Sequence, residues 1–387
     1  MSESTFLEKM LDGAEVDWKP LGEVFDVFAG GDVPKEALSK IKTEKFNIPI
    51  LSNGIGGRSL YGWTNIPKVK KPSLTISARG TIGWTSYRTE PFFPIVRLLV
   101  LTPKVEMNLR YYYHFMKTIE NDYKVAPAGI PQLTKPMIKD AQLPIPFPND
   151  PEKSLAIQAE IVRILDTFTE LTTELTTELT DRKKQYNYYR DQLLTFEDGD
   201  VEWKELGNVT EINTGQKPSE ILESATDFDY INAGTSRSGY SANSNCEGDI
   251  VTTPSRGQGG IGYVGYQKRP FWLGALCYKM KSKDKDFLIN KYLFYFLQSK
   301  RELLLGLKKE GGVPAVNKSD LAKLQIPVPS PSEQARIVAI LDKFDTLTHS
   351  ISEGLPREIE QRQKQYEYYR DLLLSFPKPE AQMEKVA

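Results

Sequence analysis

Gln158–Leu171 reads QAEIVRILDTFTEL and Gln334–Leu347 reads QARIVAILDKFDTL, and nine of these 14 positions are identical. A second repeated segment follows each of them. Arg182–Phe196 reads RKKQYNYYRDQLLTF and Arg362–Phe376 reads RQKQYEYYRDLLLSF, with 11 of 15 positions identical. An internal repeat of this kind decides the architecture before any other feature is considered. The chain therefore consists of a globular block and a long helical segment, followed by a second block and a second helical segment.

The helical segments have the residue spacing of a coiled coil. In the first segment one row is Ile161, Phe168, Leu175, Arg182, Tyr189 and Phe196, and Ile157, Ile164 and Leu171 form its partner row. This spacing predicts one helix from about residue 155 to 196 and another from about Ser332 to Phe376. Because the chain crosses a globular block between them, we expect an antiparallel pair; dimerisation through the helices of two chains is the alternative. Proline disfavours a helix interior, so Gly354-Leu355-Pro356 leaves the continuity of the second helix open.

The globular blocks resemble each other less than the helices do, but the same short motifs frame both. Val16–Gly22 (VDWKPLG) matches Val201–Gly207 (VEWKELG), and Leu143–Pro146 (LPIP) matches Ile326–Pro329 (IPVP). Inside the blocks, strand-like runs alternate with helical runs, which predicts mixed α and β structure. The expected strands are residues 74–77, 95–101, 249–253 and 275–280, and the expected helices are 111–117 and 291–305.

These patterns predict an α+β fold with a pseudo-twofold repeat, in which two mixed α/β domains are separated by two long helices that form an antiparallel coiled coil. The expected segments are a first domain at 1–150 with a short helix at 1–13, a long helix at 151–199, a second domain at 200–329, a long helix at 330–377 and a flexible tail at 378–387. Residues 6–13 imitate the end of a long helix, so we expect the second long helix to end beside them.

Composition and charge set further limits. The 387 residues carry a net charge of −1, but positive charge gathers in the two globular blocks. Residues 1–150 hold 19 Lys+Arg against 16 Asp+Glu, and residues 200–329 hold 17 against 15. So small an excess supports nucleic-acid binding only if the basic residues share a face or partner subunits add charge. A polar N-terminus, no long apolar run and only two cysteines predict a cytoplasmic protein without a membrane span or disulfide framework.

One glycine-rich loop recurs in both blocks, as Ser77–Gly83 (SARGTIG) and Pro254–Gly262 (PSRGQGGIG). Glycine lets a backbone approach a ligand closely, and Arg and Gln can pair with base edges through two hydrogen bonds. A second shared segment, GIPQ at 129–132, matches GVP at 312–314. The lysine run at 68–71 is either a solvated face or a phosphate contact. The candidate DNA-binding residues are Arg79, Thr81, Lys68, Lys70, Lys71, Gln132, Lys135, Arg256, Gln258 and Lys318.

The aromatic ends of the two helical repeats are candidates for binding a protein partner. One helix seam cannot hold all of their tyrosines, and Tyr and Arg are enriched at protein interfaces. The alternative is that they stack on each other and close the seam. The candidate partner-binding residues are Tyr186, Tyr189, Arg190, Tyr366, Tyr369 and Arg370.

The motifs of several enzyme classes are missing from the sequence. It has no GxxxxGK[ST] phosphate loop, no GxGxxG dinucleotide turn after a strand and no Asn-Pro-Pro-aromatic tetrapeptide typical of amino-methyltransferases. The two histidines, His114 and His349, lie on different segments and are expected at the surface or at an interface, so they suggest neither a metal cluster nor a catalytic triad. The chain alone is therefore predicted to catalyse nothing and to bind no metal or cofactor.

Together these features resemble the specificity subunit of type I restriction–modification systems. The matching residues are the LPIP and IPVP segments, the QAEIVRILD and QARIVAILD repeats, and the two KQYxYYRDxLLxF helix ends. The resemblance implies two target-recognition domains that each read one half of a bipartite site in double-stranded DNA. It also implies that the helices act as a ruler and bind two methyltransferase subunits, and that restriction motor–nuclease subunits join them. S-adenosylmethionine, ATP and Mg would then act through those partner subunits.

A protein from a different functional class remains an alternative at this point. A coiled-coil adaptor that binds proteins without reading bases would have the same helices. An intact complex that has no affinity for DNA would favour the adaptor.

Overall fold

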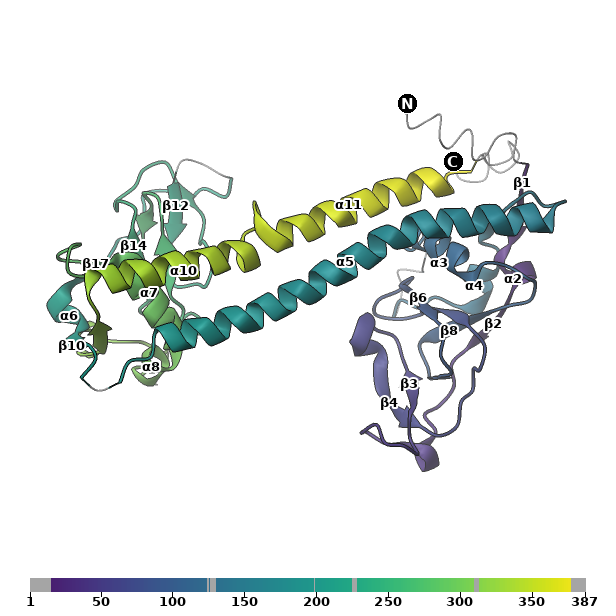
Figure 1. Cartoon of the computed structure of the whole chain (residues 1–387), viewed down its shortest axis with the longest axis horizontal. Helices are drawn as coiled ribbons and strands as arrows, with labels where there is room; N and C mark the ends of the chain where they lie inside the picture. The colour runs from purple at the N-terminus through teal and green to yellow at the C-terminus, as the bar shows by residue number, and fades with distance from the viewer. Residues whose placement is uncertain are drawn as a thin grey trace. The chain divides into compact units, whose positions relative to one another are not determined.

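The computed structural model describes residues 15–123, 125, 130–197, 199–224, 228–309 and 313–376. The predicted N-terminal helix at 1–13 and the tail at 378–387 lie outside these residues, as does the expected contact of residues 6–13. The chain forms two compact units: unit 1 comprises residues 1–174 and 359–387, and unit 2 comprises residues 175–358. Both units include part of one long helix, α5 (Pro151–Leu193) (Figure 1). The units therefore combine a globular block with helix segments from different parts of the sequence.

The described residues of unit 1 form three small sheets. The motifs that frame the first block pair with each other, because β1 (Val16–Pro20) lies antiparallel to β9 (Gln142–Pro146). The four-stranded sheet has the order β2 (Phe25–Ala29), β8 (Leu98–Pro103), β5 (Ser73–Ser77), β6 (Thr85–Arg88). The three-stranded sheet has the order β4 (Leu60–Thr64), β3 (Ile48–Leu51), β7 (Phe93–Pro94). The helices of the block are α2 (Leu21–Val24), α3 (Leu109–Thr118) and α4 (Lys135–Lys139).

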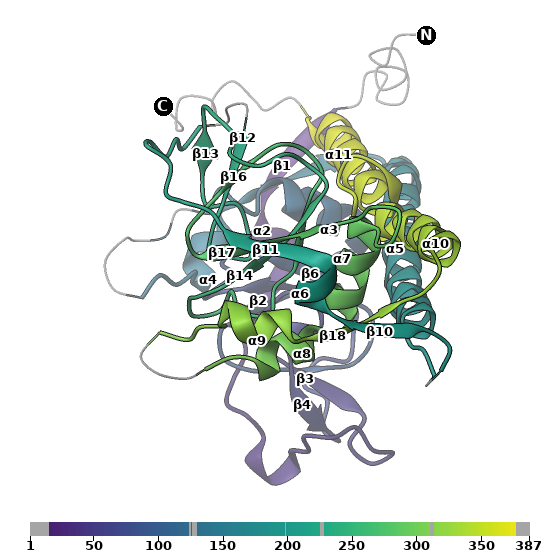
Figure 2. The same ribbon diagram turned by 90° about the vertical axis from the view of Figure 1, so that its left-hand side faces the viewer.

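Unit 2 repeats this topology strand for strand. The framing motifs again pair, as β10 (Glu202–Glu205) with β18 (Gln325–Val328). The four-stranded order is β11 (Thr210–Thr214), β17 (Cys277–Ser282), β14 (Ile250–Pro254), β15 (Gly265–Gln267), and the three-stranded order is β13 (Tyr240–Ser241), β12 (Phe228–Ile231), β16 (Trp272–Leu273) (Figure 2). The helices are α6 (Leu206–Val209), α7 (Asn290–Ser299), α8 (Arg301–Gly306) and α9 (Lys318–Ala322). The two blocks therefore share a fold although their sequences diverge.

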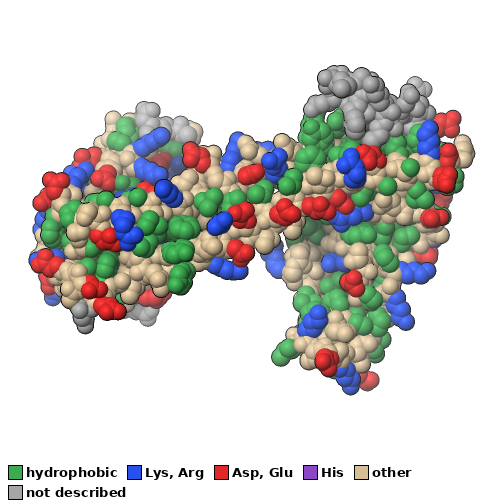
Figure 3. All heavy atoms as spheres, viewed as in Figure 1, with side chains coloured by type: hydrophobic (Ala, Val, Ile, Leu, Met, Phe, Trp, Pro, Cys, Tyr) green, Lys and Arg blue, Asp and Glu red, His purple; other side chains and the backbone are tan. Residues whose placement is uncertain are grey.

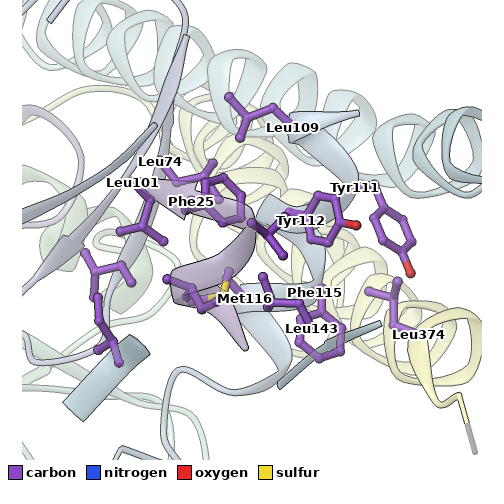
Figure 4. Close-up of a cluster of buried hydrophobic side chains, with 14 of the residues drawn as sticks. Phe25, Leu74, Leu101, Leu109, Tyr111, Tyr112, Phe115, Met116, Leu143 and Leu374 are labelled. Carbon is purple, nitrogen blue, oxygen red and sulfur yellow. The ribbon is translucent and has the colours of Figure 1, made fainter. Parts of the chain in front are cut away.

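The core of unit 1 is built around α3. Asn108 caps this helix, because its side chain accepts hydrogen bonds from the backbone N–H groups of Arg110 and Tyr111. One face of α3 buries Tyr111, Tyr112 and Phe115 against strands of the sheets and against the end of the last helix (Figure 4). Burying each large side chain of this kind contributes roughly 1.5–3 kcal/mol. The core therefore joins the globular block to helical segments from two distant parts of the chain.

The second long helical segment is two helices, which corrects the prediction of one helix at 330–377. α10 (Pro331–His349) begins after Ser330, whose hydroxyl accepts a hydrogen bond from Glu333 N. Residues 350–353 are not helical, and α11 (Gly354–Leu374) follows. Gly354 has a φ of 76°, and a Cβ there would come within 2.5 Å of the Thr346 carbonyl oxygen. Glycine therefore permits the break, and Pro356 lies in the first turn of the new helix, where proline is tolerated.

Each unit contains an antiparallel helix pair. In unit 2, Tyr189 on α5 stacks on Phe344 of α10, and Tyr186 meets His349 edge-on one turn further along α10. In unit 1, Phe168 of α5 stacks on Tyr369 of α11 at 5.1 Å between ring centroids. Between Leu165 and Tyr186, α5 has no buried residue. The expected α+β fold with paired helices is confirmed, but the central part of the seven-residue row is not buried.

Candidate nucleic-acid interface

The glycine-rich loop of unit 1 (residues 77–83, the reading loop of unit 1) joins β5 to β6. Its ends are tied together, because Gly83 N donates to Ser77 O at 3.0 Å and Ser77 N donates to Trp84 O at 3.0 Å. Gly83 has a φ of 87°, and a Cβ there would come within 2.1 Å of the Glu120 carbonyl oxygen. Only glycine fits this position without moving the backbone. The loop is thus a fixed platform.

Two of the predicted residues, Arg79 and Gln132, meet on this platform. Leu133 N donates to Ala78 O at 2.8 Å, which brings the segment containing Gln132 against the loop. The Arg79 guanidinium donates to Gln132 Oε1 from Nε, at 2.9 Å, and from Nη2. Arg79 has five N–H donors in a fixed fork. This contact therefore orients the side chain and leaves donors available for a ligand.

The reading loop of unit 2 (residues 254–262) is held in the same way. Val316 N donates to Ser255 O at 2.9 Å, and Gly257 N donates to Pro314 O at 3.0 Å. Ala315 lies opposite Arg256 and takes the position that Gln132 has in unit 1. Arg256 is exposed and makes no side-chain hydrogen bond to the residues that the structure describes. The two units thus present equivalent arginines. A side-chain amide orients the arginine of unit 1, and no such amide among the described residues orients that of unit 2.

The other predicted DNA-binding residues lie in several environments. Most are exposed, but the Thr81 hydroxyl is enclosed, without a hydrogen-bond partner among the described residues, so it does not face a ligand. Lys318 donates to Asn213 Oδ1 at 3.2 Å. The Lys68 ammonium lies 5.9 Å from the ring centres of Phe28 and Phe93. The remaining exposed members are Lys70, Lys71, Lys135 and Gln258.

Sequence reasoning missed a further loop beside each reading loop. In unit 1 it follows β3, and its Asn53 Nδ2 donates to Arg79 O at 2.8 Å. In unit 2 it follows β12, where Ala233 lies against Gly257 and Gly260. These loops carry Arg58 and Arg237, both exposed. The glycine-rich stretch at 54–57 could have indicated a functional loop in unit 1. Nothing in that stretch indicated which other loop it would contact.

The predicted partner-binding residues divide into buried and accessible groups. Tyr186 and Tyr366 are 4% and 6% exposed and fill the chain's own helix packing, so their rings are not accessible to a partner. Arg190 and Arg370 pair with the neighbouring Asp191 and Asp371. Tyr189 and Tyr369 stack on helix residues while keeping an outer edge exposed or partly exposed. Tyr188 and Tyr368 are the most exposed aromatic residues of these helix ends, at 59% and 51%.

His114 is fully buried, and it lies at the contact between α3, α5 and α11. Its Nε2 is 2.9 Å from Asp166 Oδ1, and its Nδ1 is 2.9 Å from the Tyr366 hydroxyl. Arg110 Nε lies 2.7 Å from Asp166 Oδ2. Burial lowers the pKa of His114 although its contact with Asp166 opposes this shift. Burial alone would raise the pKa of Asp166, but hydrogen bonds from His114 and Arg110 bring it below its ordinary value.

Unit 2 has an equivalent cluster without a histidine. The Tyr295 hydroxyl donates to Asp342 Oδ1, and Lys291 Nζ lies 3.1 Å from the same oxygen. Both clusters join a block to the helices through a carboxylate on the repeated ILD motif. The unit 1 cluster contains a histidine, a side chain whose protonation ordinarily changes near neutral pH, and burial opposes that protonation here.

We expect unit 1 to lose stability as the pH falls below about 6.5, the ordinary pKa of histidine. Below that pH the histidine of the unfolded chain binds a proton, whereas buried His114 in the folded chain stays neutral, so unfolding is favoured. Above that pH the contribution of neutral His114 to the free energy of unfolding is fully present. Urea unfolding followed at pH values from about 7.5 to about 5.5 measures the effect. His114→Gln cannot titrate and should flatten the pH dependence. An equally steep dependence in this variant would contradict the prediction.

Three further features of the described residues bear on function. They contain no group of three or more His, Cys, Asp or Glu side chains arranged to hold a metal ion. None of the helices placed by the structure is long and apolar enough to cross a bilayer. Cys246 and Cys277 are buried free thiols.

Comparison with known proteins identifies the class that this architecture defines. The type I restriction modification DNA specificity domain matches residues 15–182 and again residues 199–361. The chain belongs to this family, and the resemblance seen in the sequence is confirmed. It is therefore a sequence-specific DNA-recognition subunit of a type I restriction–modification complex.

Individual relatives cover nearly the whole chain. The type I restriction enzyme EcoR124I/EcoR124II specificity subunit of Escherichia coli is 38% identical over 98% of this chain and 99% of its own length. The EcoprrI specificity subunit of Escherichia coli is 33% identical over 91% and 93%. The type I S subunit of M. genitalium has a similar fold, with a TM-score of 0.63, 17% identity and coverage of 95% and 98%.

Proposed function

We propose that each unit reads one half of a bipartite DNA site through its reading loop, and that the chain itself catalyses nothing. The observation that carries the proposal is the repeated pairing of two loops. In both units the backbone N–H of Leu133 or Val316 donates to the loop that carries an arginine, Arg79 or Arg256. Arginine can pair with the O6 and N7 atoms of guanine in the major groove. Two similar platforms with different neighbouring side chains suit two different half-sites.

The remaining exposed basic residues fit the role of positioning contacts. Lys135 and Lys318 each begin a short helix directly after the segment that pairs with the reading loop. Phosphate contacts orient a protein on the duplex but carry no sequence information. Lys68, Lys70 and Lys71 would act in the same way, at some distance along the chain from the loop.

The helices are proposed to hold two methyltransferase subunits, with restriction motor–nuclease subunits added to that complex. The mostly exposed part of α5 from 170 to 185 and the exposed tyrosines Tyr188 and Tyr368 offer surfaces that the chain itself covers only in part. S-adenosylmethionine, ATP and Mg would be bound by those partner subunits. The two buried thiols fit the reducing cytoplasm in which such a complex would meet its DNA.

The proposal is tested by assembling the chain with its methyltransferase subunits and mapping every methylated position on genomic DNA. We expect a motif of two constant parts separated by a spacer of constant length and variable sequence. A contiguous motif would contradict two-unit reading. Methylation without sequence preference would favour the adaptor instead.

A second prediction concerns catalysis. The isolated chain should transfer no methyl group from labelled S-adenosylmethionine to DNA, because its sequence lacks the methyltransferase motif and a cofactor-binding turn. Adding the methyltransferase subunits should restore transfer. Label incorporation by the pure chain above that of a heat-denatured sample would contradict this.

A further inference from the structure

The small sheet of unit 1 carries a surface on which lysines and aromatic rings alternate. We define the lysine–aromatic surface as Lys40, Lys42, Lys45, Phe46, Tyr61 and Trp63. The segment that holds the lysines pairs with β4, where Ser39 and Trp63 exchange two backbone hydrogen bonds of 2.8 Å. Figure 3 shows hydrophobic and basic side chains on this part of unit 1, with acidic ones among them.

Aromatic rings, and not carboxylates, hold these lysines. The Lys40 ammonium lies 4.1 Å from the centre of the Tyr61 ring, and the Lys42 ammonium lies 5.1 Å from that of Trp63. Lys45 lies 5.6 Å from the centre of the Phe46 ring. None of the three forms an ion pair with a carboxylate in the described part of the chain. A cation on a ring keeps its charge available, so each ammonium can still bind an anion.

The surface is also apolar to an unusual degree for an exposed segment. Ile41 is 74% exposed, and Leu60 and Tyr61 are 41% and 42% exposed. Residues 38–47 contain three lysines and one glutamate. A solvated loop has no need of such side chains, whereas a duplex offers phosphates to the lysines and sugar edges to the apolar groups.

Unit 2 differs at the equivalent position. Its edge strand has one cation on a ring, Arg237 at 4.2 Å from the centre of Tyr240, but this arginine is paired with the Asp229 carboxylate at 3.0 Å. There the corresponding segment precedes β12 and pairs with the edge strand through Leu222 and Tyr240, as Ser39 pairs with Trp63 in unit 1. With Leu222 in the place of Ser39, residues 221–230 correspond to residues 38–47, and they contain Glu223, Asp227 and Asp229 and no lysine or arginine. The same backbone position is thus basic in one unit and acidic in the other, so the fold alone does not require the lysines.

The surface is connected to the reading loop of unit 1 by β3. Asn53, which donates to Arg79 O, follows this strand, and the lysine segment precedes it. The five steps along the chain from Ile48 to Asn53, which include β3, span about 17 Å at roughly 3.3 Å per residue. Base pairs rise by about 3.4 Å, so this length corresponds to about five base pairs. One duplex could therefore contact both places.

We propose that the lysine–aromatic surface binds the phosphate backbone of duplex DNA flanking the half-site read by unit 1. The inference rests on the proposed function and adds to it that recognition is asymmetric: one flank is held and the other is not. Because each phosphate contact releases counterions, three contacts steepen the salt dependence of binding by about 3 in the slope of log K against log salt.

The test uses the chain assembled with its methyltransferase subunits and duplexes that differ in flank length. One flank lies beyond the half-site of unit 1 and the other beyond the half-site of unit 2. In each duplex, each flank either has the length of about one helical turn (about 10 base pairs) or is absent. We expect loss of the unit 1 flank to weaken binding roughly 10- to 100-fold and loss of the unit 2 flank to have little effect. The triple variant Lys40→Ala, Lys42→Ala, Lys45→Ala should bind long and short duplexes equally and have a shallower salt slope.

A charge-matched control is Lys19→Ala, Lys104→Ala, Lys153→Ala, which removes three lysines elsewhere in unit 1 and should keep the flank effect. Equal flank dependence in the lysine–aromatic variant and the wild type would overturn the proposal. The variant could instead assemble poorly and show normal flank dependence in the complexes that do form. That result would assign the surface to a protein partner and would also overturn the proposal. If the wild type discriminates no half-site at all, the proposed function itself fails.

Discussion

Inserting one Thr-Glu-Leu-Thr unit into α5 after Thr180 is expected to lengthen the unread DNA spacer by about one or two base pairs and to leave both half-sites unchanged. The sequence already has this unit three times, from Thr169 to Thr180, and the boundary between the two units falls within it. Leu171, Leu175 and Leu179 recur every four residues, so a unit is about one helical turn and adds about 6 Å. Four residues also rotate the helix by about 40° beyond a full turn, close to the twist of one base pair.

Methylation mapping of the insertion variant decides the outcome. Nearly all original sites should be lost and a new set, with the same half-sites at a longer spacing, should appear. The matched control inserts four residues into the non-helical stretch 350–353, between α10 and α11, where an irregular segment can absorb them. An unchanged spacer with full activity in the α5 variant would show that α5 does not set the distance.

Arg79→Ala and Arg256→Ala are expected to weaken different half-sites. If each arginine makes two hydrogen bonds to a guanine, each loss costs about 1–3 kcal/mol, or roughly 5- to 150-fold in affinity for the cognate base. Arg79 should show the larger effect, because Gln132 already orients it and less side-chain freedom is lost on binding. Binding is measured with duplexes substituted at one half-site at a time.

The control for this pair is Arg163→Ala, which removes an exposed arginine that pairs with Glu160 on α5. It should leave half-site discrimination unchanged. If Arg79→Ala instead weakens cognate and random DNA equally, the arginine contacts phosphate and its reading role is contradicted.

The helical frame could be predicted because the repeat is written twice in the sequence. The identity of the ILD and KQY segments reflects real structural equivalence: Asp166 and Asp342 occupy equivalent clusters, as the contacts of His114 and Tyr295 show. Gly354-Leu355-Pro356 likewise pointed to the break between α10 and α11. Such features depend on the chemistry of neighbouring residues, so they can be predicted from the sequence.

The details of the blocks depend on contacts between distant residues and could be predicted only in part. Strand 74–77 was found, but the strand expected at 95–101 begins only at Leu98, because Arg97 adopts a φ of 76° that no strand allows. The helix expected at 291–305 breaks at Lys300, where the chain turns from α7 into α8. The support of Arg79 by Asn53 joins residues 26 apart in sequence, and no local pattern announces it.

The composition of the units also sets the order in which the chain can fold during synthesis. Residues 175–358 are continuous, so the core of unit 2 is complete once they have left the ribosome. Unit 1 must wait, because its core includes Tyr366, Leu373, Leu374 and Phe376, which are made after the whole of unit 2. Domains generally fold from the N-terminus during translation. Here the block made first is finished second, and until then Phe168 of α5 lacks Tyr369, the ring on which it stacks, and is open to chaperones or to another chain.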